Sequence, residues 1–261
     1  MIITVFILRH TKIPNDFLIV VCDPSPVCRL TSGVLIFSKS SAKARVMEQV
    51  IKAREVEKEY LCRVTGEFPA EEIVCEQPLE TISYKIGVVV VDPQGKPSKT
   101  TFRRVSYKDG TSIVRCLPSS GRMHQIRVHL QYLGFPIAND PLYNSQIFGP
   151  DKAKGGLTGK TNEELIEDLI KNHTLENWVE SEEYEASRMV MTESRDTTEK
   201  DSTEEDRIEE EEKEFYDADC RECRTRYKDP PADTLVMFLH ALKYSGQGWS
   251  YQTDVPSWAH L

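Results

Sequence analysis

Apolar residues gather in short runs along most of this chain. Residues 2–8 and 17–21 are rich in Ile, Val and Leu and are separated by a polar, proline-containing segment. Residues 33–39, 58–64 and 235–242 form further runs with β-branched or aromatic residues. Runs of four to eight such residues, bounded by turn signals, are typical of buried strands. The pattern therefore predicts strands near both ends of the chain.

The middle of the chain predicts an antiparallel meander. Apolar residues dominate residues 86–91, and strand patterns recur in residues 100–107 and 112–117. The turn residues Asp-Pro-Gln-Gly at 92–95 and Asp-Gly at 109–110 separate these strands. We expect the three strands to lie side by side.

Two helices are indicated by capping residues and an apolar stripe. Ser40 or Ser41 caps a helix whose stripe consists of Ala44, Met47, Val50 and Ile51. Thr161-Asn162-Glu163-Glu164 is a capping-box pattern, and it precedes the apolar residues Leu165, Ile166, Leu169 and Ile170. The second stretch therefore predicts a short amphipathic helix.

A third helix carries the most distinctive polar residues. After the turn signal at 118–121, helical spacing joins Ile126, Leu130 and Leu133, and Gly134 suits a left-handed cap. The same spacing puts three polar side chains on a shared face: His124, Arg127 and Gln131. Such a face suits an anion, either a phosphate or a catalytic carboxylate paired with the guanidinium. The alternative is a surface helix with ordinary solvated charges.

Charge is distributed unevenly along the 261 residues. The formal net charge is −9, but residues 160–219 hold 23 acidic and 7 basic residues. The remainder has 19 acidic and 26 basic residues, a net charge of +7. A basic body is the electrostatic footprint expected of a protein that contacts phosphates. Residues 193–219, with 14 acidic and 4 basic residues, are expected to be disordered or a solvated helix.

The seven cysteines are odd in number and scattered, and we interpret them as reduced thiols of an intracellular protein. The nucleus, cytoplasm and mitochondrion are not distinguished. The Cys-x-x-Cys at 220–223 lacks a second ligand pair at finger-like spacing, so we expect no metal site. The apolar start of the chain lacks the basic region of a secretory signal, and we expect no membrane segment.

Five stretches match one family in order. Gly121-Arg122-Met123-His124-Gln125-Ile126-Arg127-Val128-His129 resembles a signature of the RluA-like pseudouridine synthases, most closely the eukaryotic RNA pseudouridylate synthase domain-containing proteins. The other four matches are residues 29–39, 57–61, 139–143 and 239–242. The resemblance implies an α+β fold with a mainly antiparallel or mixed sheet and flanking helices. It also implies an isomerase that converts uridine in RNA to pseudouridine without a cofactor.

The resemblance assigns roles to several residues. Arg127 is the cation that pairs with the catalytic aspartate, and Tyr60 is the aromatic residue that lies against the target uracil. Four further residues, Arg29, Arg122, His124 and His129, are expected to contact RNA. In the family His-Arg-Leu-Asp precedes the motif that begins at Arg29, whereas this chain has Ser-Pro-Val-Cys, so Cys28 occupies the position of the aspartate. Asp23 substitutes for it only if the intervening loop folds back.

The matches divide the chain into four expected segments. Residues 1–28 are an atypical N-terminal segment, and 29–156 are a pseudouridine synthase catalytic domain that lacks the family's upstream part. Residues 157–219 are an acidic insertion, and 220–261 complete the domain. The expected partner is tRNA or mRNA, and the expected state is a monomer. Two other outcomes stay open, an RNA-binding pseudoenzyme and a truncated product that folds poorly.

Overall fold

The computed structural model of the chain describes residues 5–7, 17–22, 31–172 and 236–260, with the first two ranges described as backbone. Two compact units are distinguished, one of residues 1–169 with 231–261 and one of residues 170–230. The site lies in the first unit. Cys28, Arg29 and Asp23, the acidic residues 193–219 and the Cys-x-x-Cys at 220–223 lie outside the described residues.

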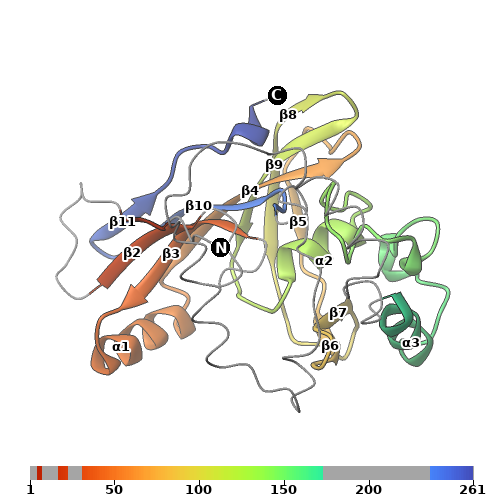
Figure 1. Cartoon of the computed structure of the whole chain (residues 1–261), viewed down its shortest axis with the longest axis horizontal. Helices are drawn as coiled ribbons and strands as arrows, with labels where there is room; N and C mark the ends of the chain where they lie inside the picture. The colour runs from red at the N-terminus through yellow and green to blue at the C-terminus, as the bar shows by residue number, and fades with distance from the viewer. Residues whose placement is uncertain (1–4, 8–16, 23–30, 173–235, 261) are drawn as a thin grey trace, which may run out of the picture. The chain divides into compact units, whose positions relative to one another are not determined.

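One mixed sheet of nine strands forms the centre of the first unit (Figure 1). Its strands, in spatial order, are β1 (Val5–Ile7), β2 (Phe17–Cys22), β3 (Ser32–Ser38), β10 (Leu239–Gly246), β4 (Glu57–Thr65), β9 (Thr111–Pro118), β8 (Thr100–Lys108) and β5 (Ile73–Cys75), with β11 (Trp249–Gln252) paired to β10. Within the described residues, neighbouring strands are antiparallel except β3 and β10. The predicted α+β fold is confirmed.

The parallel pair brings together residues that are far apart in the sequence. Ser32 lies opposite His240, and Gly33 lies opposite Ala241. Ser32 Oγ is 2.8 Å from His240 Nδ1, and His240 Nε2 is 2.6 Å from Thr253 Oγ1. β3, which lies within the matched stretch 29–39, and β10, which contains the matched stretch 239–242, are therefore neighbouring strands.

The expected three-stranded meander is wrong in one respect. β8 and β9 pair as predicted, but β7 (Val88–Val91) pairs with β6 (Leu79–Ser83) in a separate two-stranded sheet. The turn at 92–95 leads back to Leu79 rather than to β8, because Lys96 and Leu79 exchange backbone hydrogen bonds. The periodicity indicated strands correctly but not their partners.

The helices differ in how far they are buried. α1 (Ser41–Lys52) begins at the predicted cap Ser40, which accepts from Lys43 N–H, but none of its residues is buried. α2 (Gln125–Tyr132) is buried at six of its eight positions, which contradicts the alternative of a solvated surface helix. The other helical segments among the described residues are α3 (Asn162–Asn172) and the short η1 (Gln146–Phe148), η2 (Lys154–Gly156) and η5 (Ser257–Ala259).

α2 lies between two apolar clusters. On one side Ile126 and Leu130 pack against β4, β8 and β9, with Phe102 and Val114 at the centre of that cluster. On the other side Val128 packs with residues of β6, β7, η1 and α3. Burial on two sides fixes both the position and the rotation of α2, and hence the direction of its polar residues.

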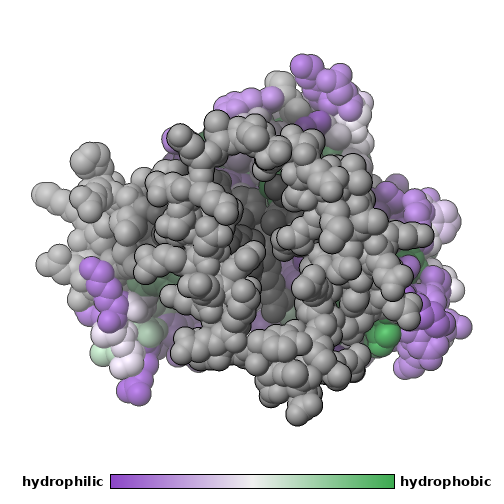
Figure 2. Space-filling model, in the orientation of Figure 1, coloured by the Kyte–Doolittle hydropathy of each residue, from purple (hydrophilic) through white to green (hydrophobic). Residues whose placement is uncertain are grey.

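α3 has the predicted capping box. Thr161 Oγ1 accepts from Glu164 N–H at 3.2 Å, and Glu164 accepts from Thr161 N–H at 2.8 Å. Its inner residues Leu165 and Leu169 are buried in the second cluster. The visible surface around α3 is mostly hydrophilic, with a small hydrophobic patch (Figure 2). No helix in the described ranges is long and apolar enough to cross a membrane.

Candidate active site

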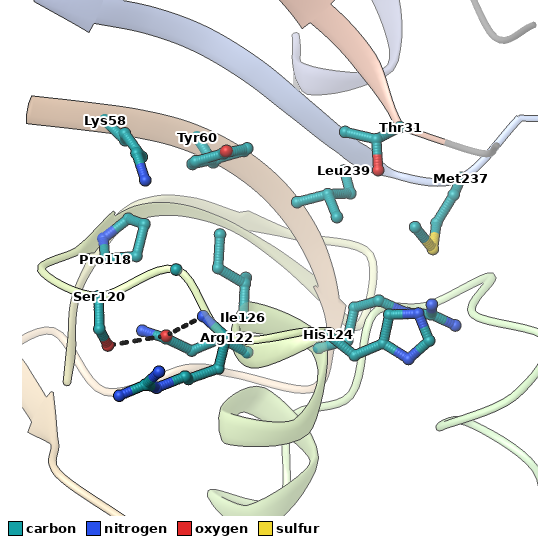
Figure 3. A pocket seen from close by; sticks show the side chains of 13 residues that line it. Thr31, Lys58, Tyr60, Pro118, Ser120, Arg122, His124, Ile126, Met237 and Leu239 are labelled. Atoms are coloured by element: carbon teal, nitrogen blue, oxygen red, sulfur yellow. Dashed lines mark hydrogen bonds between the residues drawn. The ribbon is translucent and has the colours of Figure 1, made fainter. Parts of the chain in front are cut away.

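A pocket of about 410 Å³ lies between β4 and the start of α2. Figure 3 shows Tyr60 and Lys58 on β4 facing the loop of Pro118 and Ser120, with Met237 and Leu239 at one end. The lining also includes Arg122, His124 and Arg127. Of the residues predicted from the sequence, the pocket therefore brings together Tyr60, Arg122, His124 and Arg127.

Gln125 holds the loop that precedes α2. Its Oε1 accepts from Ser120 Oγ at 2.8 Å and from Arg122 N–H at 3.1 Å, and its Nε2 donates to Lys99 O at 2.9 Å. The side chain is buried and ties the loop to β8. This role was not predicted from the sequence, because Gln125 was considered there only as part of the matched motif at residues 121–129.

His124 begins α2 in a left-handed conformation, with φ of 54°. Its Nδ1 lies 2.9 Å from the hydroxyl of Tyr143, which accepts from Val89 N–H at 3.2 Å. The Tyr143 hydroxyl thus bridges β7 and His124. The imidazole is thereby oriented at the edge of the pocket (Figure 3).

Arg127 makes a two-point ion pair with Asp140. Arg127 Nε and Nη2 each lie 2.7 Å from a carboxylate oxygen, and the side-chain exposures are 12% for Arg127 and 0% for Asp140. Asp140 Oδ1 also accepts from the N–H groups of Leu142 and Tyr143, both at 2.9 Å. The guanidinium carbon lies 4.7 Å from the centre of the Tyr143 ring. The pairing leaves Arg127 Nη1 for a second acceptor.

The predicted shared face of α2 is confirmed. His124 contacts Tyr143, Arg127 binds Asp140, and Gln131 Nε2 donates to Tyr143 O at 3.0 Å. All three polar side chains thus contact Asp140 or Tyr143, which belong to the matched stretch 139–143. Asp140 was not singled out from the sequence. A lone carboxylate in this largely apolar loop is nevertheless a signal that it is buried and paired with a cation.

Asn139 connects the same loop to β10. Its side chain donates to Val236 O at 2.7 Å and accepts from Phe238 N–H at 2.8 Å. These two bonds hold the segment that carries Met237 into the pocket wall.

Tyr60 lies on the opposite wall from α2. Its hydroxyl is 2.5 Å from the hydroxyl of Tyr244 on β10, and the ring packs against the first apolar cluster. Burial raises the pKa of Tyr60 well above its usual value, and the adjacent Tyr244 hydroxyl raises it further. Tyr60 therefore stays a neutral phenol at physiological pH and offers an aromatic surface rather than a base.

The expectation that His129 contacts RNA does not fit its position. The side chain is completely buried, with Nδ1 at 2.9 Å from Thr100 Oγ1 and Nε2 at 3.0 Å from both Gln77 O and Ser98 Oγ. The sequence shows that His129 is a polar residue of the helix, but it does not show that residues of distant segments bury it. His129 joins α2 to β8, and we assign it a structural role.

Burial lowers the pKa of His129 and outweighs the hydrogen bond to Gln77, which raises it. The unfolded chain therefore binds this proton at a higher pH than the folded chain. The contribution of His129 to stability is complete above the ordinary pKa of 6.5 and is lost as the pH falls below it. We expect the urea midpoint of the parent to fall more steeply between neutral and mildly acid pH than that of His129→Gln. Parallel pH profiles would contradict this assignment.

The chain resembles known RNA-modifying proteins over most of its length. The family model described as RNA pseudouridylate synthase matches residues 24–132. Human pseudouridylate synthase RPUSD2 is 41% identical over 264 residues, which covers 88% of this chain and 48% of that protein. The mitochondrial tRNA pseudouridine(32) synthase of Saccharomyces cerevisiae is 35% identical over 250 residues, which also covers 88% of this chain and 48% of that protein. The chain thus spans about half the length of the curated relatives it matches.

A solved structure, human RNA pseudouridylate synthase domain containing 1, shares the fold. It superposes with a TM-score of 0.51 and 18% identity, over 97% of this chain and 83% of that one. An identity this low supports the fold alone, whereas the sequence matches extend to the motifs that build the pocket. The chain therefore belongs to the RluA-like family of RNA pseudouridylate synthases, near the eukaryotic members of that family.

Proposed function

We propose that the pocket between β4 and α2 is the uridine site of an RNA pseudouridine synthase. The observation that carries the proposal is the placement of Tyr60 and Arg127, an aromatic face and an oriented cation, on the walls of one pocket. Its volume of about 410 Å³ is in the range of sites for small ligands. A single base fits such a site.

The reaction breaks the bond between ribose and uracil N1, turns the detached base, and joins it to the ribose through C5. It requires a carboxylate that acts on the nucleoside and a cation that keeps this carboxylate ionised. Asp140 holds Arg127 by Nε and Nη2, so Nη1 is the atom that would hold the carboxylate. Tyr60 would lie against the base throughout. No step requires a metal or a cofactor.

The substrate in this proposal is a uridine in tRNA. The yeast relative is named a tRNA pseudouridine synthase, and the identity with it extends over 88% of this chain. The target nucleotide must leave its stack to enter the pocket, which costs a few kcal/mol. Arg122, which is exposed, and His124 line the pocket and would contact the RNA backbone next to the target nucleotide. Arg29 is expected to add a further contact, and the monomer is the proposed acting species.

A second candidate function is RNA binding without catalysis. It is favoured by Cys28, because a thiol at the position of the family's aspartate differs from a carboxylate in both geometry and reactivity. In that case Arg127 and the basic body would still bind RNA.

Comparing the parent chain with its Cys28→Asp variant tests both candidates. We expect pseudouridine to form on tRNA transcripts with the variant, and little or none with the parent. Equal activity in both would mean that the carboxylate lies elsewhere, and Asp23 would be mutated next. If neither protein forms pseudouridine, the proposed site is contradicted, provided that both unfold cooperatively on heating.

A further inference from the structure

Two further hollows adjoin the pocket. The larger hollow, of about 400 Å³, shares Lys58 and Pro118 with the pocket. The smaller hollow, of about 260 Å³, shares Arg54 and Ser119 with the larger one. Ser120 lines both the pocket and the smaller hollow. The three spaces therefore form one depression along the ends of β4 and β9, and this depression contains the pocket for the base.

Cations without a carboxylate partner line this depression. Within the described part of the chain, Arg54, Lys58, Arg122 and Lys243 make no ion pair. The acidic residues beside them are largely neutralised. Glu59 pairs with Arg115 at 2.9 Å, and Glu76 pairs with Lys99 at 2.6 Å. Glu57 is the remaining carboxylate beside these cations, and it accepts a hydrogen bond from the Ser245 hydroxyl. The balance of unpaired charge is positive.

Lys58 stands at the boundary between the pocket and the larger hollow. Figure 3 shows its side chain reaching from β4 toward the loop of Pro118 and Ser120. A Cβ built on Gly121 would lie 3.3 Å from Lys58 Nζ, so the glycine leaves room for the ammonium group. Partial burial lowers the pKa of Lys58. A partly buried ammonium without a carboxylate partner is unfavourable in the free protein, and an anion at this point would relieve that cost.

We infer that the depression is a track for the single-stranded RNA on either side of the target uridine, with Lys58 at the phosphate of the target nucleotide and Arg54 and Lys243 at flanking phosphates. This inference rests on the proposed function and adds the path of the strand to it. Successive phosphates repeat along a strand, so a strand that passes over several cations beside the base pocket would bring a phosphate to each of them. Val56 and Leu117 in the larger hollow provide an apolar surface for a flanking base.

The experiment compares the salt dependence of RNA binding in two double variants with the same change in charge. Arg54→Gln with Lys243→Gln removes two cations of the track. Arg45→Gln with Lys108→Gln removes two exposed cations that line none of the three hollows. The full chain is titrated with a short single-stranded RNA that carries a central uridine, at several salt concentrations. Each lost phosphate contact should reduce the slope of log K against log salt by about 0.7.

We expect the track variant to lose about 1.4 from the slope, while the control keeps the parent's slope. Lys58→Met should weaken binding and leave the thermal unfolding temperature unchanged or higher, because it removes an unpaired, partly buried charge. Equal slopes in the two double variants would overturn the track and leave the proposed function standing. A parent chain whose RNA binding does not depend on salt would overturn the proposed function itself, and the track with it.

Discussion

Replacing Asp140 with alanine should lower the free energy of unfolding by about 3–5 kcal/mol. The carboxylate is completely buried and holds Arg127, which is itself 12% exposed, through two bonds of 2.7 Å. Removing one partner of a buried pair leaves the other charge without compensation, and this costs more than the pair itself contributes. Two backbone N–H groups, those of Leu142 and Tyr143, also lose their acceptor. Urea unfolding of the purified chain measures the loss.

Two variants control this result. Asp151→Ala removes an exposed carboxylate nearby in the sequence and should change stability by less than about 0.5 kcal/mol. Asp140→Ala combined with Arg127→Met removes both charges and should recover part of the lost stability. If Asp140→Ala is no more destabilising than Asp151→Ala, the ion pair does not hold the site together.

Substituting alanine for Gly33 should destabilise the fold by about 3 kcal/mol or more. Gly33 has a φ of +111°, and a Cβ at this position would lie 2.2 Å from Ala241 O in the paired strand β10. The methyl group would therefore push apart the parallel strands β3 and β10, in which residues 32–33 pair with residues 240–241. The same displacement would separate Ser32 from His240. Thermal and urea unfolding measure the effect.

Gly110→Ala is the matched control for Gly33→Ala. Gly110 also has a positive φ, +72°, but no atom lies within 4 Å of the position of its added Cβ. Only backbone strain should result, about 1–2 kcal/mol. Comparable losses in both variants would show that strain, rather than the clash with Ala241, accounts for the effect at Gly33.

Much of the local structure followed from short-range pattern. The runs at 33–39 and 58–64 are strands, and α2 begins and ends where the turn residues and Gly134 indicated. The predicted capping box between Thr161 and Glu164 forms in the structure. These features depend on hydrogen bonds and packing between residues a few positions apart, so the order of residue types contains the necessary information.

By itself the sequence determined the longer strands, the helices α1, α2 and α3, the polar face of α2 and the family, because periodicity, capping and matched motifs are properties of neighbouring residues. The short strands β5, β6 and β11 were not predicted. Tertiary structure alone decided that Asp140 is the partner of Arg127, that His129 is buried rather than presented to RNA, and that β7 pairs with β6. It also decided that Lys58 and Lys243 line one depression. These outcomes depend on which distant segments approach each other, and packing of α2 between two apolar clusters sets that choice.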